Sequence, residues 1–250
     1  MRVAGPRYAP GRSAITYGVT VLRETRAVLF DAAGTLFDLQ PDLATRLVAT
    51  LDGLTPGPDA VVRGALSRVN SRDGWPEDQP DTPSRLAAWA EFVQSVLDDT
   101  GVRVPGQGRA IAVHIVDPRS YTLFPETLAV LDHLDDQAIP CGIVSNFDGL
   151  LLNILDHLAI RDRFATIAYS GDVGVYKPDP LIFARALTAM GTAAEHAVMV
   201  GDSLYSDIGG ATAFDIRAIL VDRENLCPDH DGEVIASLAE LPPLLLKASA

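Results

Sequence analysis

Cysteine and lysine are both scarce in this 250-residue chain. Its only cysteines are Cys141, in an apolar strand-like run, and Cys227, in a polar loop, and the two lack CxxC spacing. Two cysteines with this spacing give no sign of a disulfide framework. We therefore expect a reducing, cytoplasmic location. Lysine occurs only at positions 177 and 247, against eighteen arginines, and each lysine position is therefore informative.

Long apolar runs are also absent. No segment reaches the roughly 20 residues of a transmembrane helix, and the first 25 residues scatter Arg and Pro without the continuous apolar stretch of a secretory signal. We therefore expect no membrane association. We interpret residues 1–25 as an N-terminal arm, in which residues 14–21 are a candidate edge strand.

Basic residues are fewer than acidic residues in this chain. The chain has 20 Lys and Arg against 33 Asp and Glu, for a formal net charge of −13. Such an acidic protein is not expected to bind nucleic acid. The charge also suits a site that attracts a divalent cation, although acidic surfaces commonly serve solubility alone.

What the sequence does contain is an alternation of strand-like and helix-like segments. Its hydrophobic content of 48% is enough for a packed core. Continuous apolar runs predict buried parallel strands, and apolar residues at helical spacing predict the helices between them. We therefore predict an α/β fold with a doubly wound parallel sheet. The expected strands are 27–30, 139–144, 167–169, 197–200 and 218–221, and the expected helices are 127–136, 150–158, 180–190 and 208–213.

A block without strand patterns interrupts this alternation. Helical spacing recurs over residues 41–51, 60–69, 84–98 and 106–116, with Ser84 as the expected cap of the third helix and Trp89 as part of its buried face. We predict an all-helical cap domain, residues 39–119, inserted into a core domain that consists of residues 26–38 and 120–250.

Five polar residues follow the predicted strands in order: Asp31, Ser145, Lys177, Asp202 and Asp207. Each alone is more often a turn residue or a helix cap. Right-handed crossovers, however, bring the carboxyl ends of parallel strands to one edge of the sheet. Carboxylates that converge there can hold one hard cation such as Mg²⁺, which prefers oxygen ligands.

The ordered set resembles the four signatures of the haloacid dehalogenase-like hydrolase superfamily. The resemblance implies that Asp31, in Phe30-Asp31-Ala32-Ala33-Gly34-Thr35, is a nucleophile that forms an aspartyl-phosphate. It also implies that Ser145 binds the transferring phosphoryl group. The neighbouring Asn146 either shapes the phosphate pocket or caps the next helix, and we place it with Ser145 and Lys177 among the candidate substrate-binding residues.

The later signatures concern charge. The resemblance gives Lys177, in Tyr176-Lys177-Pro178, the role of offsetting the charge of nucleophile and phosphate, a task that suits a compact ammonium. It implies a Mg²⁺ site made by Asp31, the Ala33 carbonyl, Asp202 and Asp207, where Asp207 either binds the ion or orients its waters.

The chain departs from the family pattern at Ala33, where the family carries a second Asp as acid/base. The first interpretation is a phosphatase acting on a small phosphorylated molecule, with the proton supplied elsewhere or not needed. The second is a 2-haloacid dehalogenase-type hydrolase, and the third is a binding protein that has lost turnover. Phosphonoacetaldehyde hydrolases also carry Ala there but need a cap lysine, and no lysine lies between Asp31 and Ser145.

The dehalogenase interpretation ranks below the phosphatase. The dehalogenases resemble the chain around Asp31 and Lys177, but they usually have Tyr in place of Ala33. Their last signature resembles Ser-Ser-Asn and not Gly201-Asp202-Ser203. A carboxylate at Asp202 would repel a carboxylate substrate unless a metal were bound.

Overall fold

The computed structural model describes residues 25–41, 76, 79, 81–99 and 106–245. Two sets of predictions fall outside the described residues. They are the N-terminal arm with its candidate edge strand, except for residue 25, and the helices expected over residues 41–51 and 60–69, except for Pro41. Among the described helices, none combines the length and the hydropathy that a membrane crossing requires.

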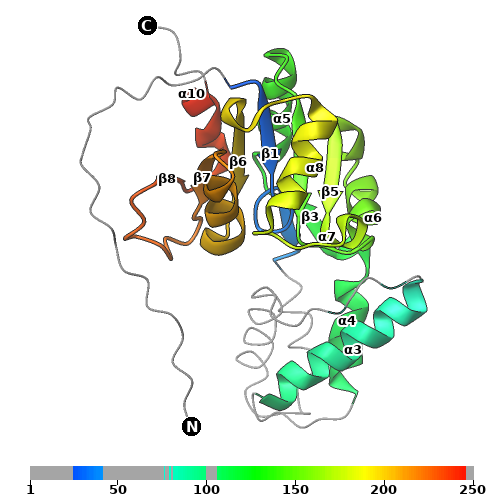
Figure 1. Cartoon of the computed structure of the whole chain (residues 1–250). Coiled ribbons are helices and arrows are strands. Elements are labelled where there is room, and N and C mark those ends of the chain that lie inside the picture. Colours follow the sequence, from blue (N-terminus) through cyan, green and yellow to red (C-terminus); the bar gives the residue numbers. More distant parts are fainter. Residues whose placement is uncertain (1–24, 42–75, 77–78, 80, 100–105, 246–250) are drawn as a thin grey trace, which may run out of the picture.

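A six-stranded parallel sheet forms the core, in the order β5-β4-β1-β6-β7-β8 (Figure 1). The central strands β1, β4 and β6 are buried at every position, as expected for strands covered by helices on both faces. This confirms the predicted doubly wound fold. The strands are β1 Ala27–Phe30, β4 Cys141–Ser145, β5 Thr166–Tyr169, β6 Ala197–Gly201, β7 Arg217–Val221 and β8 Glu233–Ile235.

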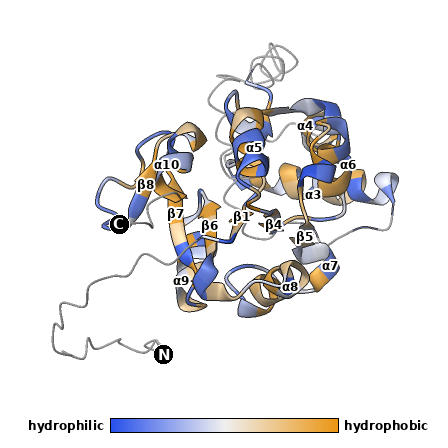
Figure 2. Ribbon diagram, turned by 90° about the horizontal axis from the view of Figure 1, so that it is seen from above, coloured by the Kyte–Doolittle hydropathy of each residue, from blue (hydrophilic) through white to orange (hydrophobic). Residues whose placement is uncertain are grey.

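Helices cover both faces of the sheet (Figure 2). One face carries α5 Thr127–Asp136, α6 Leu150–His157 and α10 Leu241–Leu245, and the other carries α7 Ser170–Val173, α8 Pro180–Met190 and α9 Gly210–Ala213. Each face has its own apolar cluster, one around Phe30 and the other around Leu29. Alternate residues of β1 thus belong to opposite layers, as strand geometry requires.

Helix α8 shows why some bounds were predictable. Asp179 accepts a hydrogen bond from the Leu181 backbone N–H, Pro180 occupies the first turn, and Gly191 ends the helix with φ of 61°. These are the residue types that begin and end helices, and the predicted range of 180–190 is correct.

The segment expected as a helix over 208–213 begins earlier. A single π-helical turn, Leu204–Gly209, precedes α9. The Ser203 side chain accepts from the Ser206 N–H and so caps this turn. The early start matters because it brings Asp207 back toward Asp202.

Two helices of the predicted cap domain are described: α3 Thr82–Asp99 and α4 Gln107–Ile115. They pack closely at Gly108, where a Cβ would overlap Gln94 and the Ala90 carbonyl. Trp89 is buried in α3, as predicted. Ser84, however, is not the cap: it lies inside the helix, and its N–H donates to Asp81, which precedes the helix.

A two-stranded ribbon connects these helices to the sheet. Strand β2 Phe37–Leu39 pairs antiparallel with β3 Tyr121–Leu123, and the Phe37 and Tyr121 rings meet edge to face with centroids 5.7 Å apart. The chain leaves and re-enters the core through this ribbon, which follows β1 directly. The domain limits at residues 38 and 120 stay a prediction, and they fall within this ribbon region.

Candidate active site

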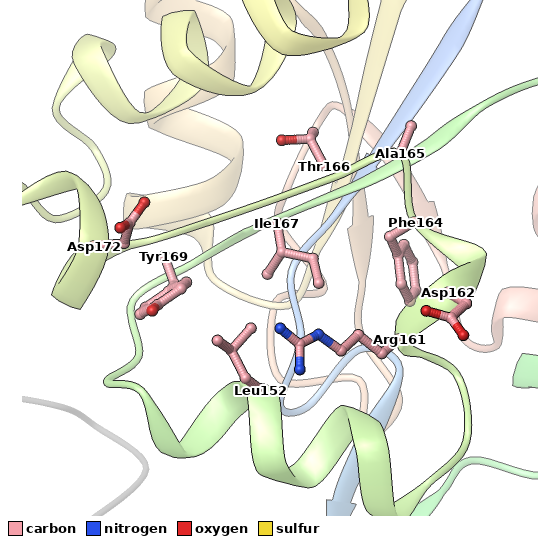
Figure 3. Close-up of a pocket in the computed structure, with 9 residues that line it drawn as sticks. All are labelled: Leu152, Arg161, Asp162, Phe164, Ala165, Thr166, Ile167, Tyr169 and Asp172. Carbon is pink, nitrogen blue, oxygen red and sulfur yellow. The ribbon is translucent and has the colours of Figure 1, made fainter.

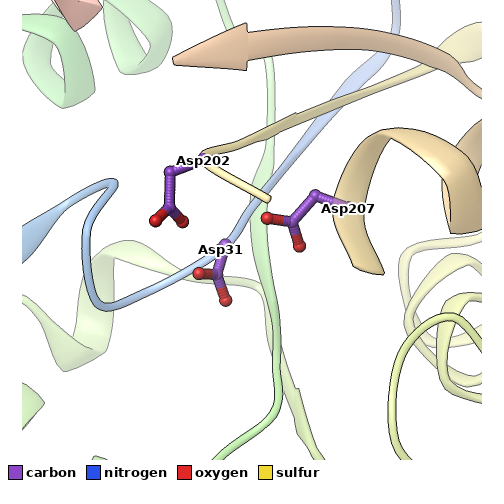
Figure 4. A group of neighbouring side chains, drawn as sticks. All are labelled: Asp31, Asp202 and Asp207. Carbon is purple, nitrogen blue, oxygen red and sulfur yellow. The ribbon is translucent and has the colours of Figure 1, made fainter. Parts of the chain in front are cut away.

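Three carboxylates converge at the carboxyl end of the sheet (Figure 4). Asp31 follows β1, Asp202 follows β6, and Asp207 comes from the π-helical turn, and their ligand oxygens all lie within 4.8 Å of one another. Asp31 and Asp207 are buried, whereas Asp202 is exposed. The structure therefore brings together residues separated by up to 176 positions.

Lys177 lies between two of these carboxylates. Its Nζ donates to Asp31 Oδ1 over 2.7 Å and to Asp207 Oδ1 over 2.6 Å, and its side chain is fully buried. Three carboxylates against one ammonium leave two net negative charges. That is the charge that a divalent cation would offset.

Asp207 is held in an unfavourable setting for a carboxylate. Burial raises its pKa and the neighbouring Asp31 charge adds to this, while the Lys177 ammonium and the Ser203 N–H oppose the rise. The close approach depends on Gly201, where a Cβ would overlap the Asp207 carboxyl group. A bound cation would relieve this site.

Ser145 and Asn146 occupy the end of β4. Ser145 Oγ is buried and donates to Asp31 Oδ1 over 2.9 Å. The Asn146 side chain instead hydrogen-bonds with the backbone of Lys177. Ser145 thus lies directly against the predicted nucleophile, and Asn146 lies against the residue that offsets its charge.

The turn after β1 approaches Asp202 closely. Gly34 has φ of +86°, which favours glycine, and a Cβ there would also overlap the Asp202 carboxylate. The buried Thr35 hydroxyl lies 3.5 Å from Asp202 Oδ1. Ala33 pairs with Phe37 in this turn. Thr35 stood inside the quoted motif, but nothing in its spacing indicated contact with Asp202.

Arg223 also contacts this turn, and no pattern in the sequence indicated it. Its guanidinium lies 3.6 Å from the centre of the Phe124 ring, donates to the Thr35 carbonyl over 3.0 Å, and pairs with Glu126 over 2.6 Å. Burial raises the pKa of Glu126, but its hydrogen bonds, led by Arg223, outweigh that and leave the pKa lowered. Arg223 is one of eighteen arginines, and nothing in the sequence around it distinguishes it as a contact of this turn.

A second arginine joins the helical segment to the core. Arg85 of α3 donates to Asp148 over 2.7 Å, and both side chains are about nine-tenths buried, with exposures of 9% and 10%. Asp148 lies three residues after Ser145 and also accepts from the Leu150 N–H at the start of α6. The loop that follows β4 therefore contacts helix α3 directly.

The donor set fits magnesium. Every candidate ligand side chain is a carboxylate, in an arrangement with an excess of two negative charges. Hard divalent cations favour such oxygen donors, whereas zinc sites typically contain Cys or His.

A separate open groove lies along the edge strand β5 (Figure 3). It has a volume of about 520 Å³ and combines apolar side chains with Arg161 and Asp172. None of the residues that line it belongs to the carboxylate cluster. Its lining residues are Leu152, Arg161, Asp162, Phe164, Ala165, Thr166, Ile167, Tyr169 and Asp172.

The sequence of this chain is similar to known hydrolases. The sequence model of the haloacid dehalogenase-like hydrolases matches residues 25–215. A phosphoserine phosphatase of Thermus thermophilus is 31% identical over 175 residues, 67% of this chain and 68% of that protein. A phosphoglycolate phosphatase of Rhodospirillum rubrum is 28% identical over 221 residues, 86% of this chain and 85% of that protein.

Solved structures share the fold. An L-2-haloacid dehalogenase from Xanthobacter autotrophicus superimposes with a TM-score of 0.64 at 18% identity, covering 90% of this chain and 100% of that one. At this level of identity the likeness concerns the fold alone.

Proposed function

Because the chain belongs to the haloacid dehalogenase-like hydrolases, and is itself a hydrolase, we propose that it is a magnesium-dependent phosphatase acting on a small phosphorylated molecule. The observation that carries the proposal is the placement of the Asp31 carboxylate against Lys177, with Asp202 and Asp207 beside it. A carboxylate can attack an anionic phosphate only where cationic groups offset the repulsion.

The metal site in this proposal consists of Asp31, Asp202, Asp207 and the Ala33 carbonyl. Bound Mg²⁺ would lower the repulsion between nucleophile and phosphate and stabilise charge on the transferring oxygens. Exposed Asp202 faces solvent, which suits entry of an ion. Both oxygens of Asp207 already accept a hydrogen bond, Oδ1 from Lys177 and Oδ2 from the Ser203 N–H. Asp207 would therefore either bind the ion through a further lone pair of one oxygen or orient metal-bound water.

Asp31 is the proposed nucleophile. Ser145 and Lys177 both donate to its Oδ1, which restrains the orientation of the carboxylate. Attack on phosphorus forms an aspartyl-phosphate and releases the leaving group, and water then hydrolyses the acyl phosphate to regenerate Asp31. The same Ser145 hydroxyl and Lys177 ammonium lie close enough to Asp31 to donate to phosphoryl oxygens attached to it.

The leaving group is the point at which Ala33 limits the chemistry. A positioned general acid contributes a factor of about 10²–10⁴ to many reactions, and Ala33 has no proton to give. Leaving groups that depart as stable anions need no such acid. We therefore propose acyl phosphates and phenolic phosphate esters as the substrates that this site handles best.

Two other functions remain as alternatives with specific support. A 2-haloacid dehalogenase would use the same fold, which the chain shares with the solved dehalogenase. The exposed carboxylate of Asp202 disfavours it, because a haloacid is itself an anion and Asp202 would repel it unless a metal were bound. A binding protein without turnover is favoured only by Ala33.

One set of assays separates these functions. Wild-type protein, Asp31→Asn and the exposed-site control Asp162→Asn are each given acetyl phosphate, p-nitrophenyl phosphate and 2-chloropropionate, with Mg²⁺ or with a chelator. We expect Mg²⁺-dependent phosphate release by wild type and the control, and none by Asp31→Asn. Metal-independent chloride release would identify a dehalogenase, and phosphate binding without turnover would identify a binding protein.

A further inference from the structure

Asn146 and Lys177 are joined by two hydrogen bonds that use the side chain of one and the backbone of the other. Asn146 Oδ1 accepts from the Lys177 N–H over 2.6 Å, and Asn146 Nδ2 donates to the Lys177 carbonyl over 3.0 Å. The amide thereby pairs with both main-chain polar groups of Lys177. It would have to break both bonds to turn toward a ligand.

Lys177 needs such an anchor because of where it lies. It belongs to the connection between α7 and α8, residues 174–179, and is in neither a helix nor a strand. Its side chain has four rotatable bonds, and yet its ammonium must meet two carboxylates from different elements, Asp31 and Asp207. The backbone position therefore decides whether the ammonium reaches both.

Asn146 is itself firmly held. It follows Ser145, the last residue of β4, which pairs with β1 on one side and β5 on the other. The next residue, Phe147, accepts at its carbonyl from the Ser170 hydroxyl and from the Gly171 N–H, each over 3.0 Å. The sheet that places Asp31 thus also places Asn146.

We propose that Asn146 is a positioning residue that acts on the reaction through Lys177 and does not itself bind the phosphoryl group. It holds the Lys177 backbone at the one location from which the ammonium bridges Asp31 and Asp207. This assignment replaces the role in substrate binding that the sequence suggested. Its kinetic consequences rest on the proposed function, but its structural consequence does not.

The kinetic test is a double-mutant cycle with acetyl phosphate and Mg²⁺. Asn146→Ala should lower kcat about 10- to 100-fold while KM changes by less than about threefold. In a Lys177→Met background the same change should cost nothing further, because the residue through which it acts is gone. Asn153→Ala, an exposed asparagine on α6, is the matched control and should leave kcat and KM unchanged.

Asn146→Asp covers the case in which the alanine variant does not fold. It keeps the side-chain shape and the oxygen that accepts from the Lys177 N–H, but it cannot donate to the Lys177 carbonyl. We expect a lower kcat at nearly constant KM for this variant as well.

The structural test is a crystal structure of Asn146→Ala, or of Asn146→Asp, beside one of wild type. We expect Lys177 Nζ to leave hydrogen-bonding distance of Asp31 or of Asp207 in the variant. This measurement remains valid if wild type hydrolyses none of the phosphates, an outcome that would refute the proposed function alone.

Three results would overturn the inference. The first is a rise in KM with kcat unchanged, and the second is a full additional loss from Asn146→Ala in the Lys177→Met background, since both would mean direct contact with substrate. The third is an ammonium that stays in place in the variant crystal structure.

Discussion

Ala33 is the residue that most restricts what the site can do. It lies two positions after Asp31 in a turn that is otherwise built for close approach to Asp202. If only a proton donor is missing, Ala33→Asp should raise turnover of alkyl phosphates by about 10²-fold or more, and that of acetyl phosphate much less. Initial rates on the two substrate classes measure this difference.

The matched control for this change is Ala87→Asp, which adds the same charge at an exposed position of α3. It should alter neither rate. Equal rates for wild type and Ala33→Asp on both substrate classes would show that the turn is not arranged for ester hydrolysis.

Cys141 provides a prediction about packing in the sheet. The thiol is buried in β4, and this burial, reinforced by the charge of Asp135, raises its pKa to about 12. At pH 8 the reactive thiolate would be only about 10⁻⁴ of the total. Ellman's reagent should therefore modify one thiol, Cys227, in native protein and two after unfolding. Rapid modification of both in native protein would contradict the buried position of β4.

At this scale the sequence was most informative where a residue type is unusual. The one lysine outside the C-terminal segment was identifiable because lysine is scarce in this chain, and Asp31 and Asp202 were identifiable because they directly follow apolar strands. Thr35 and Arg223 were not, because their contacts join positions that are 167 and 188 residues apart in sequence. Such pairs depend on how the turn after β1 packs, which no local pattern reveals.

Among the elements, the sheet strands and the helices with clear end signals were predictable. The segments that the sequence did not indicate are short or irregular: the β2–β3 ribbon, α7, β8, α10 and the π-helical turn. Three-residue strands contain too few positions to establish an alternating pattern. The π-helical turn is stabilised by hydrogen bonds of Ser203 and Asp207, residue types that are typical of loops.

The turn after β1 depends on Arg223, which links it to α5 and to Phe124. Arg223→Met should lower the free energy of unfolding by about 1–3 kcal/mol, since it removes the cation that pairs with the partly buried Glu126 and the donor to the Thr35 carbonyl, and leaves Glu126 with the Leu238 N–H. Urea denaturation measures the loss. Arg119→Met, which removes an exposed ion pair with Asp117, should cost less than about 1 kcal/mol. Equal losses would mean that Arg223 does not support the turn.

The same pair has a defined pH dependence. The pKa of Glu126 is lower in the folded state than its ordinary value of 4.5. The stabilisation is therefore present above about pH 4.5 and is lost as the pH falls through the folded-state pKa. The stability difference between wild type and Arg223→Met should shrink in acid. A difference that grows as the pH falls would contradict this assignment.

For the molecule as a whole, the Arg85–Asp148 pair links the helical segment to the loop that begins at Ser145. Because both side chains are mostly buried, a double-mutant cycle with Arg85→Met and Asp148→Asn should give a coupling energy of about 1–3 kcal/mol. Arg85→Met should also lower kcat/KM and speed hydrogen exchange in α3. The exposed pair Arg161–Asp156 is the control, with an expected coupling below about 1 kcal/mol. Equal coupling in the two pairs would argue against a link between cap and core.

The architecture followed from the sequence because strands and helices alternate and parallel strand ends must meet at one edge. The contacts between cap and core did not follow. Arg85 and Asp148 each look like ordinary surface residues on their own elements, and only the packing of α3 against the core buries them together.

The most direct measurement of the central claim is the rate of acetyl phosphate hydrolysis by chelator-stripped protein as Mg²⁺ is added back. If the three carboxylates and Lys177 surround one divalent ion, the rate begins near zero and saturates with Mg²⁺, and Asp202→Asn needs at least about tenfold more Mg²⁺ for half of its maximum. A full rate in the presence of chelator, or an unchanged Mg²⁺ requirement in Asp202→Asn, would contradict the account.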